Sequence, residues 1–417
     1  MGVAARTPHS RTPGWIQNIL AVPAFRYRDF RYLWFAVFFN SISRLGELVA
    51  LSWLVLERTD SPFMVGVALG IRMVPHFFVG LLGGALVDRF DRRHLMRLLN
   101  LGMAAMAALI GVLIMFDVVG LWQILALTLV SGVFRSLFQI SRSSFSFDIV
   151  GPRNVISGQA LSALAMRFGG IVGSVSMGFI VKAYGVDAAY IVLAFGYLAA
   201  TLLLLPIRSA GQSAPVNRQP VWQNLKEYFS ELRSNRTLTA ILLLTVGTET
   251  LGFSHQAVLP SLVRDVLHVG PEWLGIMTAF RSAGGVVGVV ILTAMGEVRR
   301  KGLVMLLSIL VFGISVIVLG YASTLSTAII VVTVVNMAGF LSDILGGSIM
   351  QLVVPNEQRG RAAGSWVLAI GTSPIGQLQM GGLASAISVS LALTLNGVGL
   401  VILAVACLLF VPRLRKL

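Results

Sequence analysis

Long apolar runs alternate with short polar segments along the whole chain. A helix needs about 20 apolar residues to cross the hydrocarbon core of a bilayer, and a tilted helix needs more. Runs of this length recur about twelve times, at residues 31–57, 61–87, 94–117, 120–147, 157–182, 187–207, 238–264, 271–295, 302–321, 324–350, 361–386 and 389–411. They are too long for barrel strands, and backbone groups in lipid need internal partners. The pattern therefore predicts an all-α integral membrane protein with twelve transmembrane helices.

The longest polar segment, residues 208–237, separates the first six runs from the last six. Its first part is rich in Ser, Gly, Gln and Pro and is typical of a flexible linker. Its second part, residues 221–236, places apolar residues at helical spacing and predicts an interfacial amphipathic helix. We expect an N-terminal segment at 1–30, a six-helix half at 31–207, this linker at 208–237, a second six-helix half at 238–411 and a tail at 412–417.

Composition agrees with a membrane class, since hydrophobic residues make up 56% of the chain, charged residues 12%, and the mean hydropathy is +0.85. The net charge of +15 could suggest a nucleic-acid partner, but the basic residues lie in short segments between apolar runs. They follow the positive-inside pattern: one side of the predicted topology keeps only Arg58, Lys182 and Arg264. We therefore expect a multi-pass protein of the plasma or inner membrane, with both termini cytosolic and no nucleic-acid partner.

A glycine-rich turn with an acid and a basic cluster joins the second and third runs, at Gly83–Arg93. A degraded copy, Gly296–Lys301, lies at the matching place of the second half and indicates an internal repeat. The first loop resembles the signature G-x-x-x-D-R-x-G-R-R between helices 2 and 3 of the major facilitator superfamily of transporters, with Asp91 in place of the second glycine. The resemblance implies two pseudo-symmetric six-helix halves.

Finer motifs resemble the exporter branch of that superfamily, which includes enterobactin exporters and macrolide-efflux-like proteins. They are Leu45–Pro62, Arg72-x-x-Pro75 and Pro355–Arg361. Two positions depart from the patterns of proton antiporters. Ser174 replaces the proline of the antiporter motif in helix 5, and Arg135 lies more than a turn beyond the arginine usual in helix 4. The resemblance implies proton-coupled export by alternating access, with helices 1, 4, 7 and 10 lining a central cavity.

Three acids lie well inside apolar runs, where a charge costs about 2.5 to 3.5 kcal/mol to insert. They are Glu47, Glu249 and Asp343. By resemblance all three could face the cavity and carry the coupling proton or another coupling ion. Glu47 has an equal alternative, a permanent ion pair with Arg44 three residues earlier on the same helix face. No basic residue lies within one turn of Glu249 or Asp343, which favours a titrating role for them.

Five arginines lie deep in the runs: Arg44, Arg72, Arg135, Arg167 and Arg281. Positions 72 and 167 are often basic in the exporter branch, so we expect these two to bind carbonyls or helix ends, whereas Arg135 and Arg281 lack that explanation. Because arginines outnumber acids, the cavity is expected to be positive and the substrate to be a small amphipathic organic anion. The predicted substrate and coupling residues are Arg44, Glu47, Arg135, Glu249, Arg281 and Asp343.

Other polar residues inside the runs favour structural roles. His255 fits a hydrogen-bonded structural histidine better than a proton relay. Amides such as Gln139 and Asn336 could line the cavity, but bridging between helices explains them equally well.

The opening loop also predicts a conformational gate. By resemblance, Asp88 lies near the start of helix 11, where a carboxylate beside the helix N-terminus gains about 0.3 to 1 kcal/mol and Arg361 could add an ion pair. Gly84 would permit close packing, and Arg89, Arg92 and Arg93 would hold the loop at the anionic leaflet. The hypothesis is a latch that closes the cytosolic side. Asp91 could bind one of these arginines and weaken the role of Asp88.

Motifs for metal, acyl-transfer or phosphate chemistry do not occur in the sequence, so we expect no enzyme activity and no cofactor. An ion gradient is then the expected energy source, and a monomer the expected state. Two alternatives remain: an inward symporter or facilitator of the same fold, and a non-transporting sensor or lipid-handling membrane protein.

Overall fold

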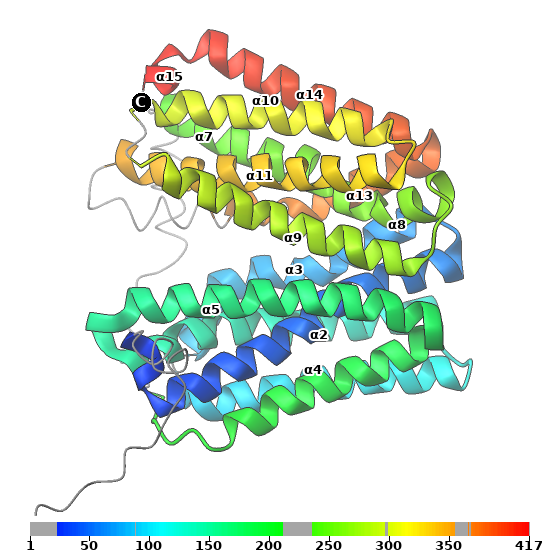
Figure 1. Ribbon diagram of the computed structural model, residues 1–417, viewed down its shortest axis with the longest axis vertical. Coiled ribbons are helices and arrows are strands. Elements are labelled where there is room, and N and C mark those ends of the chain that lie inside the picture. The colour runs from blue at the N-terminus through cyan, green and yellow to red at the C-terminus, as the bar shows by residue number, and fades with distance from the viewer. Residues whose placement is uncertain are drawn as a thin grey trace, which may run out of the picture.

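The computed structural model describes residues 23–87, 89–211, 236–296, 299–354, 366 and 368–416. The regular structure of these residues is helical throughout, without a strand. The helices form two groups, one above the other in Figure 1, with α2 to α5 below and α7 to α15 above. The predicted all-α fold is confirmed.

The first group begins with a short 3-10 helix and continues with four long helices. They are η1 (Pro23–Arg26), α2 (Arg28–Thr59), α3 (Pro62–Val87), α4 (Arg92–Met115) and α5 (Leu121–Leu204). Two glycines with positive φ break the 84 residues of α5, Gly151 at 70° and Gly185 at 88°. Glycine adopts this left-handed conformation without the steric cost of a Cβ atom. Because a crossing takes about 20 residues, α5 is long enough for three of them.

The second group holds the remaining helices. They are α7 (Arg236–Gly247), η2 (Thr248–Gly252), η3 (Phe253–Val258), α8 (Leu259–Ser261), η4 (Leu262–Val266), α9 (Pro271–Ala294), α10 (Lys301–Gly320), α11 (Leu325–Val353), α13 (Ser373–Ala386), α14 (Val389–Phe410) and α15 (Pro412–Lys416). The stretch from α7 to η4 is one rod in which α-helical, π-helical and 3-10 turns alternate. Such irregular turns are frequent at functional sites.

Nine helices among the described residues are long and apolar enough to cross a membrane, with α5 counted once. Together with the two extra crossings of α5 and the shorter α13, this number is consistent with the twelve expected. The amphipathic helix predicted at 221–236 lies outside the described residues except for its last residue.

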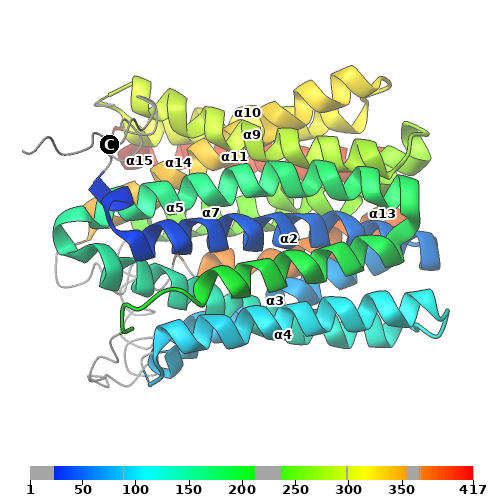
Figure 2. The same ribbon diagram turned by 60° about the horizontal axis from the view of Figure 1, so that its bottom comes forward.

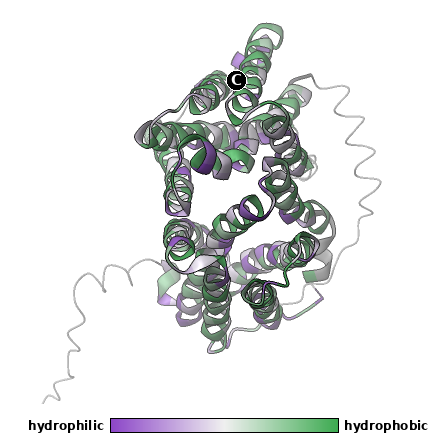
Figure 3. Cartoon of the chain, turned by 90° about the vertical axis from the view of Figure 1, so that its right-hand side faces the viewer, coloured by the Kyte–Doolittle hydropathy of each residue, from purple (hydrophilic) through white to green (hydrophobic). Residues whose placement is uncertain are grey.

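Side chains on the outside of the bundle are largely apolar. Trp122 is 81% exposed and Phe410 is 83% exposed, and Figure 3 shows hydrophobic colour over most of the helices. Exposed apolar surface of this extent marks a surface that contacts lipid.

The long helices run roughly parallel (Figure 2), so the bundle has two ends. We call one the basic end, because it carries Arg89, Arg92, Arg153, Arg208 and Arg300; the other, with Asp60, Asp117, Gly185 and Tyr321, we call the opposite end.

Polar contacts between the two groups lie at the opposite end. Lys182 Nζ of α5 is 2.6 Å from Glu272 Oε1 of α9, and Arg264 of η4 pairs with Asp60 beyond the end of α2. The backbone N–H of Phe63 in α3 donates to Ser385 Oγ in α13 over 2.9 Å. These bonds hold the two groups together on this side.

Glycines allow the backbones of the two groups to touch at the same end. A Cβ added to Gly275 of α9 would lie 2.3 Å from the carbonyl oxygen of Ser174 in α5, and one added to Gly178 would lie 2.7 Å from that of Pro271. No side chain fits at either place without a shift of the helices. Gly178 and Gly275 therefore allow close packing of the two groups here.

Candidate functional site

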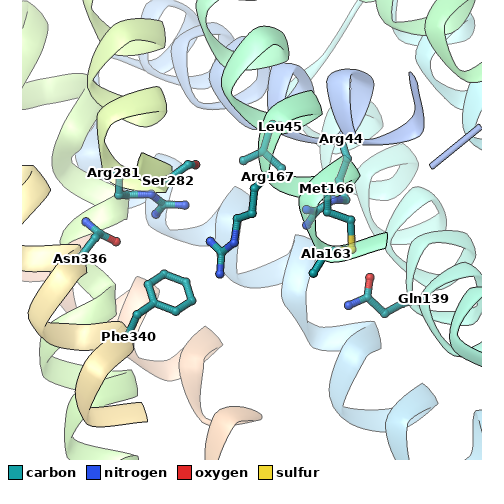
Figure 4. A pocket seen from close by; sticks show the side chains of 11 residues that line it. Arg44, Leu45, Gln139, Ala163, Met166, Arg167, Arg281, Ser282, Asn336 and Phe340 are labelled. Atoms are coloured by element: carbon teal, nitrogen blue, oxygen red, sulfur yellow. The ribbon is translucent and has the colours of Figure 1, made fainter. Parts of the chain in front are cut away.

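A cavity of about 430 Å³ lies between the two groups of helices. Its walls come from α2, α5, α9 and α11, through Arg44, Leu45, Gln139, Ala163, Met166, Arg167, Gly170, Arg281, Ser282, Asn336 and Phe340. Figure 4 shows Arg281, Asn336 and Phe340 on one wall, Arg44, Met166 and Gln139 on the other, and Arg167 between them. The site is therefore shared by both groups.

Three arginines give the cavity its charge. Arg44 comes from α2, Arg167 from α5 and Arg281 from α9, and none of the described lining residues is acidic. Arg281 donates a hydrogen bond to Gln256 of η3. The Arg167 guanidinium lies 4.4 Å from the centre of the Phe340 ring. This contact corrects the expectation that Arg167 binds carbonyls or helix ends: its long side chain crosses the cavity and stacks on a ring of the other group.

Glu47 pairs with a different arginine from the one expected. Arg135 Nη2 lies 2.9 Å from each Glu47 carboxylate oxygen, and Tyr197 Oη donates to Oε2 over 2.9 Å. The expected pair with Arg44 is wrong, because Glu47 is buried inside the first group while Arg44 lines the cavity. Arg135 thus has the ion-pair partner that the sequence did not reveal.

Arg72 binds a carbonyl, as its position predicted. Its Nη2 donates to the carbonyl oxygen of Arg44 over 2.8 Å. The contact fixes α3 against α2 next to the cavity.

Glu249 and Asp343 interact with each other in the second group, and neither belongs to the described lining of the cavity. Glu249 lies in the π-helical turn η2, is 7% exposed and is hydrogen-bonded to Ser373 of α13. Asp343 in α11 interacts electrostatically with Glu249. Asp343 Oδ1 is buried and has no hydrogen-bond partner among the described residues. Across the same residues no three His, Cys, Asp or Glu side chains gather as a metal site.

The basic loop after α3 is organised by Asp91. Its Oδ1 accepts a hydrogen bond from the Arg93 backbone N–H over 2.8 Å and so caps α4, and Oδ2 lies 3.4 Å from Arg93 Nη2. Partial burial acts to raise the pKa of Asp91, but the Arg93 N–H and guanidinium lower it below its ordinary value. The expectation that Asp91 binds a neighbouring arginine is confirmed.

Arg92 was expected to lie at the lipid surface, but it is buried in the protein. Its Nη1 is 3.0 and 2.8 Å from the two carboxylate oxygens of Asp148 in α5, and both side chains are buried. Arg93 Nη1 donates a hydrogen bond over 3.2 Å to the carbonyl oxygen of Arg208, which follows the end of α5. Arg92 therefore ties α4 to α5, and Arg93 ties α4 to the segment that follows α5. Of the three arginines, Arg89 alone is exposed.

The predicted latch cannot be assigned from these contacts. Asp88 and Arg361 lie outside the described residues, and Gly84 lies within α3. The latch stays a prediction.

Sequence reasoning missed Phe340 and Asp148. Phe340 follows Asn336 by four residues, so the two share a helix face, and extending the pattern from Asn336 would have found it. Asp148 carried a weaker signal, a lone acid at the basic end of a run.

Known proteins resemble the chain over nearly its full length. The family model described as "Transmembrane secretion effector" matches residues 20–417. The enterobactin exporter EntS of Citrobacter koseri is 26% identical, and that of Shigella flexneri 27%, each over 96% of both chains. These relatives are exporters rather than enzymes.

Solved structures resemble the fold at low sequence identity. The nucleoside transporter NupG superposes with a TM-score of 0.79 at 12% identity, over 91% of this chain and 99% of that one. A bacterial homologue of the lysosomal transporter Spinster, in an inward-facing conformation, gives 0.67 at 15% identity, over 93% and 95%. The chain therefore belongs to the transmembrane secretion effector family and is a multi-pass membrane transporter of the major facilitator superfamily.

Proposed function

We propose that the protein exports a small amphipathic organic anion through the cavity between its two halves, α2 to α5 and α7 to α15. One observation carries the proposal: both halves contribute arginines to a cavity whose described lining holds no acid. The volume of about 430 Å³ suits a small molecule, and Phe340 with Met166 offers apolar surface to its uncharged part. The relatives named enterobactin exporters favour the outward direction over an inward symporter.

We propose that the protein lies in the inner membrane with its basic end and both termini on the cytosolic side. Cytosolic segments of membrane proteins carry the excess of Lys and Arg. Bound anion would then enter from the basic end. Release requires the contacts at the opposite end, such as Lys182 with Glu272, to separate while the basic end closes. We propose that a monomer carries out this cycle.

We propose that protons drive this transport cycle by binding to Glu249 and Asp343. Both acids are largely buried, they interact, and Asp343 Oδ1 has no partner in the described part of the chain. Glu47 is less suited, because Arg135 and Tyr197 occupy its oxygens. Neither acid belongs to the described lining of the cavity, so proton and anion would occupy different sites.

Transport by purified protein in liposomes tests the proposal. We expect uptake of a radiolabelled hydroxybenzoate and none of the lipophilic cation tetraphenylphosphonium. Arg281→Gln should lower the initial rate about tenfold or more, since a hydrogen bond to a charged group contributes about 1.5 to 3 kcal/mol. Arg153→Gln, which changes an exposed arginine at the basic end, is the matched control and should leave the rate unchanged. Cation transport without anion transport would refute the proposal.

The same liposomes test the coupling ion. With a pH-sensitive dye inside, anion flux should move protons in the opposite direction, and Asp343→Asn or Glu249→Gln should abolish that movement. Protons that move together with the anion would show a symporter instead.

A further inference from the structure

The wall of the cavity around Asn336 is held by a chain of hydrogen bonds that runs through His255. His255 is fully buried in η3, and its Nδ1 lies 2.7 Å from the Gly252 carbonyl oxygen. Its Nε2 lies 3.4 Å from Asn336 Nδ2, which also donates to the Val332 carbonyl oxygen over 3.0 Å. The carbonyl oxygens of Gly252 and Val332 therefore form the two ends of this hydrogen-bonded chain.

A carbonyl oxygen only accepts hydrogen bonds, so the two carbonyls determine which atoms of His255 and Asn336 donate and which accept. The atom of Asn336 that faces Val332 must be the NH₂ group, so the orientation of the amide is settled. The ring nitrogen that faces Gly252 must likewise carry a proton. Nε2 then accepts from the Asn336 NH₂, which makes His255 a neutral imidazole protonated on Nδ1.

The amide of Asn336 consequently turns its oxygen away from the hydrogen-bonded chain. Oδ1 has no hydrogen-bond partner among the described residues, although Asn336 is only 2% exposed and lines the cavity. In Figure 4 this side chain lies beside Arg281 and Phe340. The wall thus offers the Asn336 amide oxygen as an acceptor next to guanidinium groups that only donate.

We infer that the transporter selects anions that also carry a hydrogen-bond donor, an O–H or N–H group, which Asn336 Oδ1 accepts. Asn336 is then a specificity-determining residue, and His255 a positioning residue that orients its amide. The inference rests on the proposed anion site. It adds that an anion whose donor is blocked fits the arginines but leaves Oδ1 buried without a partner, which costs binding free energy.

Matched probes test this inference. The 2-, 3- and 4-hydroxybenzoates differ from the corresponding methoxybenzoates by one O–H donor. Binding to the purified protein in detergent is followed by tryptophan fluorescence. We expect the wild type to bind at least one hydroxybenzoate about five- to tenfold more tightly than its methoxy partner, as one hydrogen bond allows.

Variants separate positioning from a merely structural role. Asn336→Leu should abolish the preference and leave affinity for the methoxybenzoate nearly unchanged. His255→Leu should abolish it as well, whereas His255→Gln should restore it, because a glutamine amide can both donate to Gly252 and accept from Asn336. Gln139→Leu, on the facing wall, should keep the preference.

Equal binding of hydroxy and methoxy anions by the wild type overturns the inference and leaves the anion site intact. A preference that survives in Asn336→Leu, or is lost only in Gln139→Leu, also overturns it. If neither kind of anion binds, and Arg281→Gln changes nothing, the proposed function fails together with the inference.

Discussion

At the scale of single residues, the buried pair of Glu47 and Arg135 shows how charge is accommodated inside the first half. Both carboxylate oxygens and the Tyr197 hydroxyl take part, and the Glu47 side chain is 5% exposed. A buried pair contributes little net stability, because desolvation offsets the attraction between the charges. Removal of one partner, however, leaves an uncompensated charge in the core.

Arg135→Met should therefore lower the free energy of unfolding by about 3 kcal/mol or more. The double variant Glu47→Gln with Arg135→Met should recover much of that loss, since no charge is left unpaired. Thermal unfolding in detergent, followed by tryptophan fluorescence, measures both. Tyr197→Phe is a milder comparison and should cost about 1 kcal/mol. Losses that simply add in the double variant would show that the two residues are not coupled.

The sequence predicted which residues are charged inside the membrane but assigned several partners incorrectly. Spacing along one helix suggested Arg44 for Glu47, whereas the actual partner lies 88 positions away. Helical periodicity tells which residues share a face, but the rotation of α5 against α2 comes from packing of whole helices. Arg92 was misplaced for the same reason, because its partner Asp148 belongs to another helix.

At the scale of elements, the apolar runs predicted helix positions well. Observed α2, α3, α4, α9, α10, α11 and α14 overlap the expected runs almost completely. The sequence did not reveal that the seventh run contains π-helical and 3-10 turns. Helix α13 packs closely against these turns, since a Cβ added to Gly376 would lie 2.6 Å from the Thr250 carbonyl oxygen. Contacts of this kind are invisible in a hydropathy pattern.

Two elements are expected to oppose each other in the conformational cycle: the latch loop after α3 at the basic end, and the contact of α5 with α9 at the opposite end. Asp88→Asn should weaken the latch and favour the conformation closed at the opposite end. Gly178→Val should do the reverse, because its side chain would meet the Pro271 carbonyl oxygen.

Labelling measures both effects. A cysteine at Ala163 in the cavity, in a Cys407→Ser background, is exposed to an impermeant maleimide in inverted vesicles, where a cytosolic basic end faces the medium. We expect severalfold faster labelling in Asp88→Asn and slower labelling in Gly178→Val. An unchanged rate in Asp88→Asn would dismiss the latch.

At the scale of the whole molecule, guanidinium groups from both halves meet in the cavity. Arg281 of the second half and Arg167 of the first repel each other electrostatically, and the proposed anion would neutralise both. Closure around a bound anion would therefore meet less resistance than closure around an empty cavity. The return of the unloaded carrier should be the slower half of the cycle.

Exchange experiments reveal this asymmetry. Liposomes loaded with labelled hydroxybenzoate should release it severalfold faster when unlabelled hydroxybenzoate is present outside. In Arg281→Gln the acceleration should shrink, because the repulsion between the halves is reduced. External anion that has no effect on release would contradict the expectation.

The arginines that both halves contribute to the cavity thus bear on the efficiency of coupling as well as on substrate recognition. A carrier that crosses readily when empty lets its driving ion leak without moving cargo. Like charges on both halves would slow the movement of the empty carrier, and the proposed anion would supply the counter-charge that removes this repulsion.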